Sequence, residues 1–149
     1  MISLIICSRN NNIKGLLKEN IDETIGVEYE LIVIDNSHKN YSLFSAYNVG
    51  VKKAMFPYLC FIHDDIYFHV EKWGERVISH FKENSKVWIL GVAGSHYMPK
   101  TPSGWYQPHV TSGGCIQGFF KDDNYYTEKR IDLHRFAGKT SIEAIAVDG

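Results

Sequence analysis

The chain has 149 residues, and 16 Lys and Arg against 17 Asp and Glu give it a formal net charge of -1 at pH 7. This length suits one domain that buries roughly two thirds of its unfolded surface around a single core. The balanced charge provides no basic field for a nucleic-acid backbone, so we expect no nucleic-acid partner. The three cysteines, Cys7, Cys60 and Cys115, lack metal-type spacing and predict reduced core thiols.

The sequence predicts no membrane span. No apolar run approaches the ~20 residues of a membrane helix, and the amino terminus carries no basic leader. We therefore expect no membrane span and a cytoplasmic location, with association at the inner face of the membrane left open. The sequence does not predict an oligomeric state.

Apolar runs alternate with helical stripes along the first 95 residues. Continuous apolar runs predict buried strands at 2–7, 29–34, 58–62 and 87–93. Apolar residues at helical spacing predict three helices, carried by Ile13, Leu16, Leu17 and Ile21; by Leu43, Tyr47, Gly50, Val51 and Ala54; and by Val70, Trp73, Val77, Ile78 and Phe81. This order requires right-handed crossovers, so we expect an α/β fold with a mainly parallel sheet and helices on both faces.

The composition changes after Gly94, where prolines and glycines predict a long functional loop over residues 94–114. The runs 116–120 and 125–131 predict a hairpin, a small antiparallel addition to the sheet. Residues 142–147 predict a final strand.

Three polar residues, His63, Asp64 and Asp65, follow the third predicted strand. Open α/β sheets bind ligands outside the carboxyl ends of their strands, and acid at such a position favours a cation or a proton. The alternation of side chains along a strand places His63 and Asp65 on one side and Asp64 on the other, unless the backbone bends. The alternative is a surface turn with two solvated aspartates.

Four segments in order resemble the nucleotide-sugar half of family 2 glycosyltransferases: 2–10, 30–37, 46–54 and 61–66. The resemblance implies one domain of the GT-A fold over 1–149, with a nucleotide-sugar-binding half at 1–95 and a partial acceptor-side half at 96–149. It implies an inverting transfer from a nucleotide sugar, such as a UDP-sugar, to a hydroxyl of a glycan or lipid-linked acceptor, assisted by Mn²⁺ or Mg²⁺. The His-Asp-Asp form looks closest to a bacterial branch, which suggests polysaccharide biosynthesis.

The resemblance also implies roles for individual residues on the donor side. Its nucleotide-binding positions correspond to Ser8, Arg9, Asp35, Asn48 and Asp64. The alternatives are a capping role for Asp35, a surface Arg9 and a solvated Asn48, whereas the interior helix position of Gly50 favours close packing.

The metal motif departs from the family pattern. The family places two carboxylates as Asp-x-Asp, whereas the same spacing here pairs His63 with Asp65. Mn²⁺ tolerates imidazole better than Mg²⁺ does, so these two residues are the predicted metal ligands.

The acceptor side offers fewer signals. Asp148 is the predicted general base, with Glu143 and the Asp122-Asp123 pair as weaker candidates, and a turn before Gly149 is the alternative role of Asp148. The resemblance also allows the general base to lie beyond residue 149, because we expect this chain to be truncated at its carboxyl end.

The aromatic segment with Trp105, Tyr106 and His109 predicts an acceptor-binding lid, because rings stack on the apolar faces of sugars. The alternative is a cover for the edge of the core or a subunit contact.

Two other enzyme classes lack their sequence signatures here. The segment after the first strand is not the Gly-rich loop that a nucleotidyltransferase or a Rossmann oxidoreductase requires. The remaining alternative is a noncatalytic nucleotide-sugar or carbohydrate-binding module, which would bind the same ligands without transferring a sugar.

Overall fold

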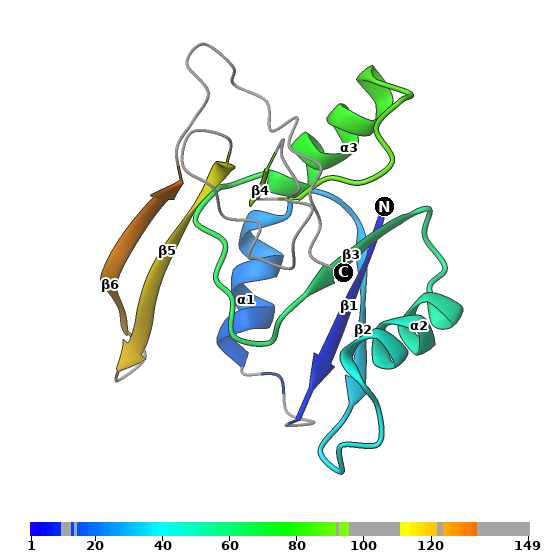
Figure 1. The fold of residues 1–149 in the computed structure, drawn as a ribbon, viewed down its shortest axis with the longest axis horizontal. Coiled ribbons are helices and arrows are strands. Elements are labelled where there is room, and N and C mark those ends of the chain that lie inside the picture. Colours follow the sequence, from blue (N-terminus) through cyan, green and yellow to red (C-terminus); the bar gives the residue numbers. More distant parts are fainter. Residues whose placement is uncertain (10–12, 14, 92, 96–110, 122–123, 134–149) are drawn as a thin grey trace, which may run out of the picture. The chain divides into compact units, whose positions relative to one another are not determined.

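The computed structural model describes residues 1–9, 13, 15–91, 93–95, 111–121 and 124–133 (Figure 1). These residues belong to two units, Met1–Ser85 and Lys86–Gly149, which we describe separately. The predicted division between residues 95 and 96 therefore lies inside the second unit. Whether both halves form one domain stays a prediction.

The first unit alternates strands and helices in the predicted order. Its elements are β1 (Ile2–Ser8), α1 (Gly15–Thr24), β2 (Tyr29–Asp35), α2 (Leu43–Lys53), β3 (Tyr58–Ile62) and α3 (Trp73–Glu83). The strands form a parallel sheet in the order β2-β1-β3. The predicted α/β class and the first three strands are confirmed.

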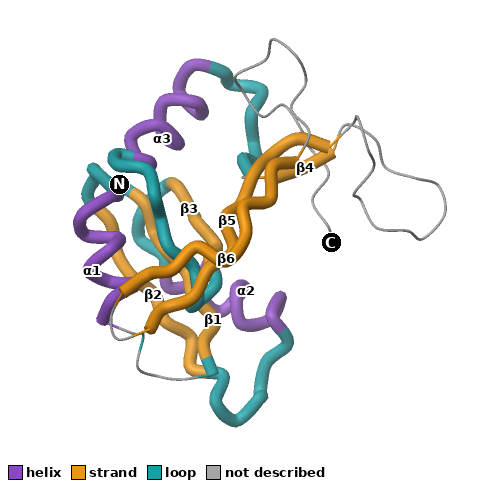
Figure 2. Tube along the Cα trace, turned by 90° about the vertical axis from the view of Figure 1, so that its left-hand side faces the viewer, coloured by secondary structure: helices purple, strands orange, loops and turns teal. Residues whose placement is uncertain are grey.

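The two crossovers run in opposite directions across this sheet. The chain passes from β1 to β2 on one side of β1 and then returns past β1 to β3. Because both crossovers are right-handed as a rule, a reversal of direction places the connecting helices on opposite faces. Figure 2 shows α1 and α3 on one side of the strands and α2 on the other.

Alternating side chains of β1 supply the core of both faces. Ile2, Leu4 and Ile6 pack toward α1 and α3, whereas Ile5 belongs to the cluster that α2 covers. A Cβ at Gly50 of α2 would lie 2.3 Å from Ile5 Cγ2, so only glycine allows the helix to approach this closely. The predicted packing role of Gly50 is confirmed.

The third helix begins later than its apolar stripe predicts. Val70 is exposed and precedes α3, which starts at Trp73. Lys72, at the N-cap, adopts a left-handed conformation with φ 56° that a continuous helix cannot contain. The stripe from Trp73 to Phe81 was predicted correctly, but Val70, its predicted first member, lies outside the helix.

The second unit contains an antiparallel sheet in the order β4-β5-β6. Its strands are β4 (Ala93–Ser95), β5 (Thr111–Lys121) and β6 (Asn124–Leu133), with an irregular register between Gln117 and Gly118. The predicted hairpin is confirmed, and its strands are longer than predicted. The predicted loop from Gly94 to Gly114 is wrong at both ends, because those residues lie in β4 and β5.

The predicted parallel strand at 87–93 is wrong. Residues 87–91 form no strand, and β4 begins only at Ala93, where it pairs antiparallel with β5. An apolar run of this length does not by itself determine a strand, because the backbone groups also need a partner. The predicted strand at 142–147 lies outside the described residues.

Two further predictions concern cysteines and membrane spans. Cys7 and Cys60 are free and half-buried, and burial raises the pKa of the Cys60 thiol from 9.0 to about 11, as expected for an inert core thiol. None of the helices in the described part of the chain has the length and apolar character needed to cross a bilayer.

Candidate functional site

The carboxyl end of β1, between those of β2 and β3, lies at the point where the strand order reverses. Ser8 of β1 is in register with Asp35 of β2, and the Asn36 N–H donates to the Ser8 carbonyl at 2.7 Å. The chain leaves these neighbouring strands toward opposite faces, to α1 and to α2. In open α/β sheets, the crevice at such a switch point is where ligands bind.

The loop after β3 joins this place through Asp64. The Ser8 hydroxyl donates to Asp64 Oδ2 at 2.5 Å, which connects the ends of β1 and β3. Ser8 is buried and Asp64 half-buried, while His63 and Asp65 are exposed, in agreement with the predicted alternation. Ser8 therefore holds one carboxylate against the sheet, and the next carboxylate faces solvent.

Asp35 is exposed, and its Oδ1 accepts the backbone N–H of Ser37 at 2.8 Å. This backbone hydrogen bond, the Ser37 hydroxyl and the nearby His38 together hold the pKa of the Asp35 carboxyl below its ordinary value of 3.8. Asp35 does not cap α2, whose N-cap is Ser42, so the alternative capping role is not found and the carboxylate instead closes a local turn with Ser37. The carboxylate remains accessible at the same edge, and its nucleotide role stays a prediction.

Two other predicted nucleotide-binding residues are exposed. Arg9 follows β1 directly, within the edge described above, and Asn48 lies on α2. The neighbour of Asn48 bonds the carboxyl end of β3, because the Tyr47 hydroxyl donates to the Ile62 carbonyl at 3.4 Å. The aromatic ring of Tyr47 also lies 5.0 Å from that of Phe61.

The donor set at this edge suits a cation that arrives with its ligand. Among the described residues, no group of three or more His, Cys, Asp or Glu side chains could hold a metal by itself. Mg²⁺ and similar cations are commonly held by one or two carboxylates together with substrate phosphates. His63 and Asp65, adjacent to Asp64, fit such a partial set.

The predicted acceptor-side residues lie outside the described residues. They are the general-base candidates Asp148, Glu143, Asp122 and Asp123, and the acceptor-binding residues Trp105, Tyr106 and His109. Their roles stay predictions.

Two asparagines that hold loops at this edge were not predicted from the sequence. Asn36 Nδ2 donates to the Tyr41 carbonyl at 2.9 Å, and the Tyr41 N–H donates to Asn36 Oδ1 at 3.0 Å. Asn20 makes the same pair of bonds to Phe68. Asn20 carried a signal, because it lies on the apolar stripe of α1, where a polar residue needs buried partners.

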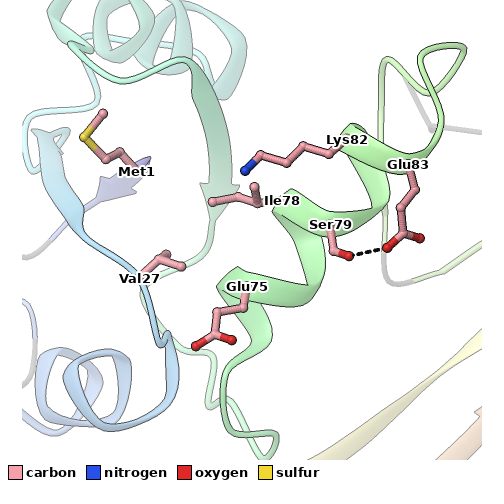
Figure 3. A pocket seen from close by; sticks show the side chains of 7 residues that line it. All are labelled: Met1, Val27, Glu75, Ile78, Ser79, Lys82 and Glu83. Atoms are coloured by element: carbon pink, nitrogen blue, oxygen red, sulfur yellow. Dashed lines mark hydrogen bonds between the residues drawn. The ribbon is translucent and has the colours of Figure 1, made fainter.

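A hollow of about 550 Å³ lies elsewhere in the first unit (Figure 3). It is lined by Met1, Val27, Glu75, Ile78, Ser79, Lys82 and Glu83. Met1 and Val27 precede β1 and β2, so this hollow borders the amino ends of the strands and contains none of the predicted site residues. Because ligands of open α/β sheets bind at the carboxyl ends, we place the candidate site there and not in this hollow.

The model of a glycosyltransferase-like family matches residues 3–149. A search of curated proteins finds no match to the chain. The parallel sheet with its helices is an α/β arrangement of the GT-A type, as the four sequence motifs predicted. The chain therefore belongs to the glycosyltransferase-like family, of the family 2 type.

Proposed function

We propose that this protein transfers a sugar, with inversion, from a nucleoside-diphosphate sugar such as a UDP-sugar to a hydroxyl acceptor. Family membership supports glycosyl transfer. One observation supports the donor site in particular: the hydrogen bond from Ser8 to Asp64, at the switch point where Ser8 is in register with Asp35. This bond and the pairing of Ser8 with Asp35 bring together the ends of three strands at the edge where α/β sheets of this class bind nucleotides.

The charges at this edge suit the parts of a nucleoside diphosphate. The exposed Asp35 carboxylate is an acceptor for a base N–H or a ribose hydroxyl. The exposed Arg9 guanidinium offers donors and positive charge to phosphate. In the proposal Asn48 and Asp64 complete the donor site, and Ser8 orients Asp64.

Breaking the bond between sugar and diphosphate develops negative charge on the leaving group, which preorganised charges stabilise. We propose Asp65 and His63 as the protein ligands of Mn²⁺ or Mg²⁺. The cation would supply electrostatic stabilisation of the diphosphate when bound.

The acceptor hydroxyl needs a general base within hydrogen-bond reach. Asp148 is the proposed base, and Trp105, Tyr106 and His109 are the proposed acceptor contacts. The proposed acceptor is a glycan or a lipid-linked sugar. We propose that the protein acts in the bacterial cytoplasm, or at the inner face of the membrane, in polysaccharide biosynthesis.

A thermal scan with UDP and Mn²⁺ tests the donor site. Ligand at about 100 times its dissociation constant stabilises the folded state by ~2.7 kcal/mol. At this chain length that free energy raises the melting midpoint by roughly 5 to 10 °C. Asp65→Asn should remove the part of the shift that depends on Mn²⁺, whereas Asp22→Asn, at an exposed aspartate of α1, should leave it unchanged.

The same samples separate transfer from binding alone. An active transferase releases UDP from a UDP-sugar, faster when its acceptor is present. A ligand-dependent shift without release or transfer from any donor would instead indicate the noncatalytic binding module. The absence of any shift with nucleoside diphosphates would contradict the proposal.

A further inference from the structure

The core-facing stripe of α1 contains a buried amide. Asn20 is 3% exposed and lies between Leu17 and Thr24 on the buried side of the helix. An amide in such surroundings costs free energy unless its donor and acceptor both find partners. What Asn20 bonds is therefore informative.

Both partners of Asn20 belong to one distant residue. Asn20 Nδ2 donates to the Phe68 carbonyl at 3.0 Å, and the Phe68 N–H donates to Asn20 Oδ1 at 2.7 Å, across 48 positions of sequence. The side chain thus bonds the backbone of Phe68 as a neighbouring strand would. It fixes this point of the loop after β3 to helix α1.

The fixed point lies shortly after the candidate metal and nucleotide residues. Exposure alternates along this loop: Asp64, Ile66 and Phe68 are half-buried, whereas Asp65 and Tyr67 are exposed. Ile66 and Phe68 pack against the core cluster of β1, α1 and α3. Asp65 is therefore held between two hydrogen-bonded points, the Ser8 bond to Asp64 on one side and the Asn20 bonds to Phe68 on the other.

Neighbouring contacts hold the far end of the same loop. The rings of Phe68 and Trp73 stack with centroids 4.2 Å apart and an interplanar angle of 8°. Trp73 Nε1 donates to Thr24 Oγ1 at 3.1 Å, and the Thr24 hydroxyl donates to the Asn20 carbonyl at 2.6 Å. Thr24 provides a matched comparison, because it anchors the start of α3 and does not bond the segment next to Asp65.

We propose that Asn20 is a positioning residue of the donor site, which holds the Asp64–Phe68 segment in the conformation that presents Asp65 to a cation and a diphosphate. This inference rests on the proposed function. A preorganised segment binds its ligand without the entropic cost of ordering. Loss of the two bonds should therefore weaken nucleotide binding as well as loosen the loop.

The experiment compares Asn20→Ala with Thr24→Val in the full chain. Amide hydrogen exchange is measured over residues 63–70, and the dissociation constant for UDP with Mn²⁺ is measured well below both melting midpoints. In Asn20→Ala we expect protection of this segment to fall about tenfold and the dissociation constant to rise about five- to tenfold. Thr24→Val should lower the melting midpoint because it removes a partner of Trp73, but it leaves the two bonds of Asn20 to Phe68 in place, so both quantities should stay within about twofold of the unaltered protein.

A milder variant keeps the test decisive where alanine prevents folding. The hydroxyl in Asn20→Ser can bond a helix carbonyl four residues earlier but is too short to replace both bonds to Phe68, so we expect the same direction of change. Unchanged exchange over 63–70 in a folded Asn20 variant would overturn the anchoring role. Faster exchange with an unchanged dissociation constant would overturn the positioning role.

The failure of the proposed function has a different signature. In that case the unaltered protein would bind neither UDP nor other nucleoside diphosphates with Mn²⁺. The exchange measurement needs no ligand, so it would still report whether Asn20 anchors the loop, and the positioning role would fall together with the proposed function.

Discussion

The loops that follow β2 and β3 are held by the same pair of hydrogen bonds in different surroundings. In the first, Asn36 bonds both backbone groups of Tyr41, only five positions away and at an exposed site. In the second, Asn20 bonds both backbone groups of Phe68 across 48 positions and is itself buried. Water can replace the local, exposed hydrogen bonds of Asn36 at little cost in free energy, whereas loss of the buried hydrogen bonds of Asn20 leaves polar groups unsatisfied.

The difference indicates how the two sides of the candidate site are built. The loop after β2, which carries Asp35, is closed by its own residues. The loop after β3, which carries Asp64 and Asp65, depends on α1 and α3 for its conformation. We therefore expect substitutions in the core to disturb the loop of Asp65, proposed to bind the cation, more than the loop of Asp35, proposed to bind the nucleobase or ribose.

The largest effect is expected at the aromatic anchor of the second loop. Trp73→Ala removes a ring that is 8% exposed and stacked on Phe68, which should lower the free energy of unfolding by about 3–5 kcal/mol. Tyr41→Ala in the first loop removes a ring that is 39% exposed and should cost less than about 1 kcal/mol. Urea unfolding measures both, and equal losses would contradict the comparison.

Close backbone packing gives the next effect. A Cβ at Gly74 would lie 2.7 Å from the Ile25 carbonyl oxygen, so Gly74→Ala should destabilise the protein by about 1–3 kcal/mol. Gly15→Ala is the matched control, because its Cβ would meet only Glu19 Oε1 at 3.9 Å. The control should be neutral or slightly stabilising in a thermal scan. A stable Gly74→Ala protein would show that α3 does not pack this closely on Ile25.

A smaller loss of stability is expected when the exposed hydrogen bonds between Asn36 and Tyr41 are removed. Asn36→Ala removes the two bonds to Tyr41, which water can replace, and a weak 3.7 Å bond to Cys7 Sγ, so it should cost about 1 kcal/mol or less. Hydrogen exchange should become faster over residues 37–41 and remain unchanged over 63–70. Faster exchange in both loops would show that they are coupled and that the distinction between them fails.

The smallest effect is expected for the pH dependence of the loop that carries Asp35. The Ser37 N–H, the Ser37 hydroxyl and His38 lower the pKa of Asp35 below 3.8, so ionised Asp35 stabilises the folded first loop. This contribution is complete above the unfolded pKa and is lost as the pH falls through the lower folded value. A carboxyl titration by NMR should therefore show a midpoint below 3.8, accompanied by faster exchange of the Ser37 amide. Asp35→Asn, which does not titrate here, should show no such acceleration.

Much of the first unit could be predicted from local pattern. The run Ile2–Cys7 is apolar at every position but Ser3, and a strand buried on both faces requires this. The predicted strand at 87–93 failed because apolar character does not specify a partner, and Ala93 pairs with Gly113 in an antiparallel sheet. The late start of α3 followed from the left-handed Lys72, which carries no signal in the sequence.

The candidate site was predictable in outline only. Alternation along β3 correctly separated Asp64 from His63 and Asp65. The bond between Ser8 and Asp64 joins residues 56 positions apart, and the bonds of Asn20 to Phe68 span 48. Pairings at such distances depend on the order of strands and on helix packing, which no local pattern encodes.

The carboxyl edge of the sheet is the proposed binding site of a nucleoside diphosphate. The most direct test maps hydrogen exchange with and without UDP and Mn²⁺. We predict increased protection at Ser8–Arg9, at Asp35–Ser37 and at His63–Asp65. Protection confined to the hollow of Val27 and Glu75–Glu83, or no protection anywhere, would contradict the account.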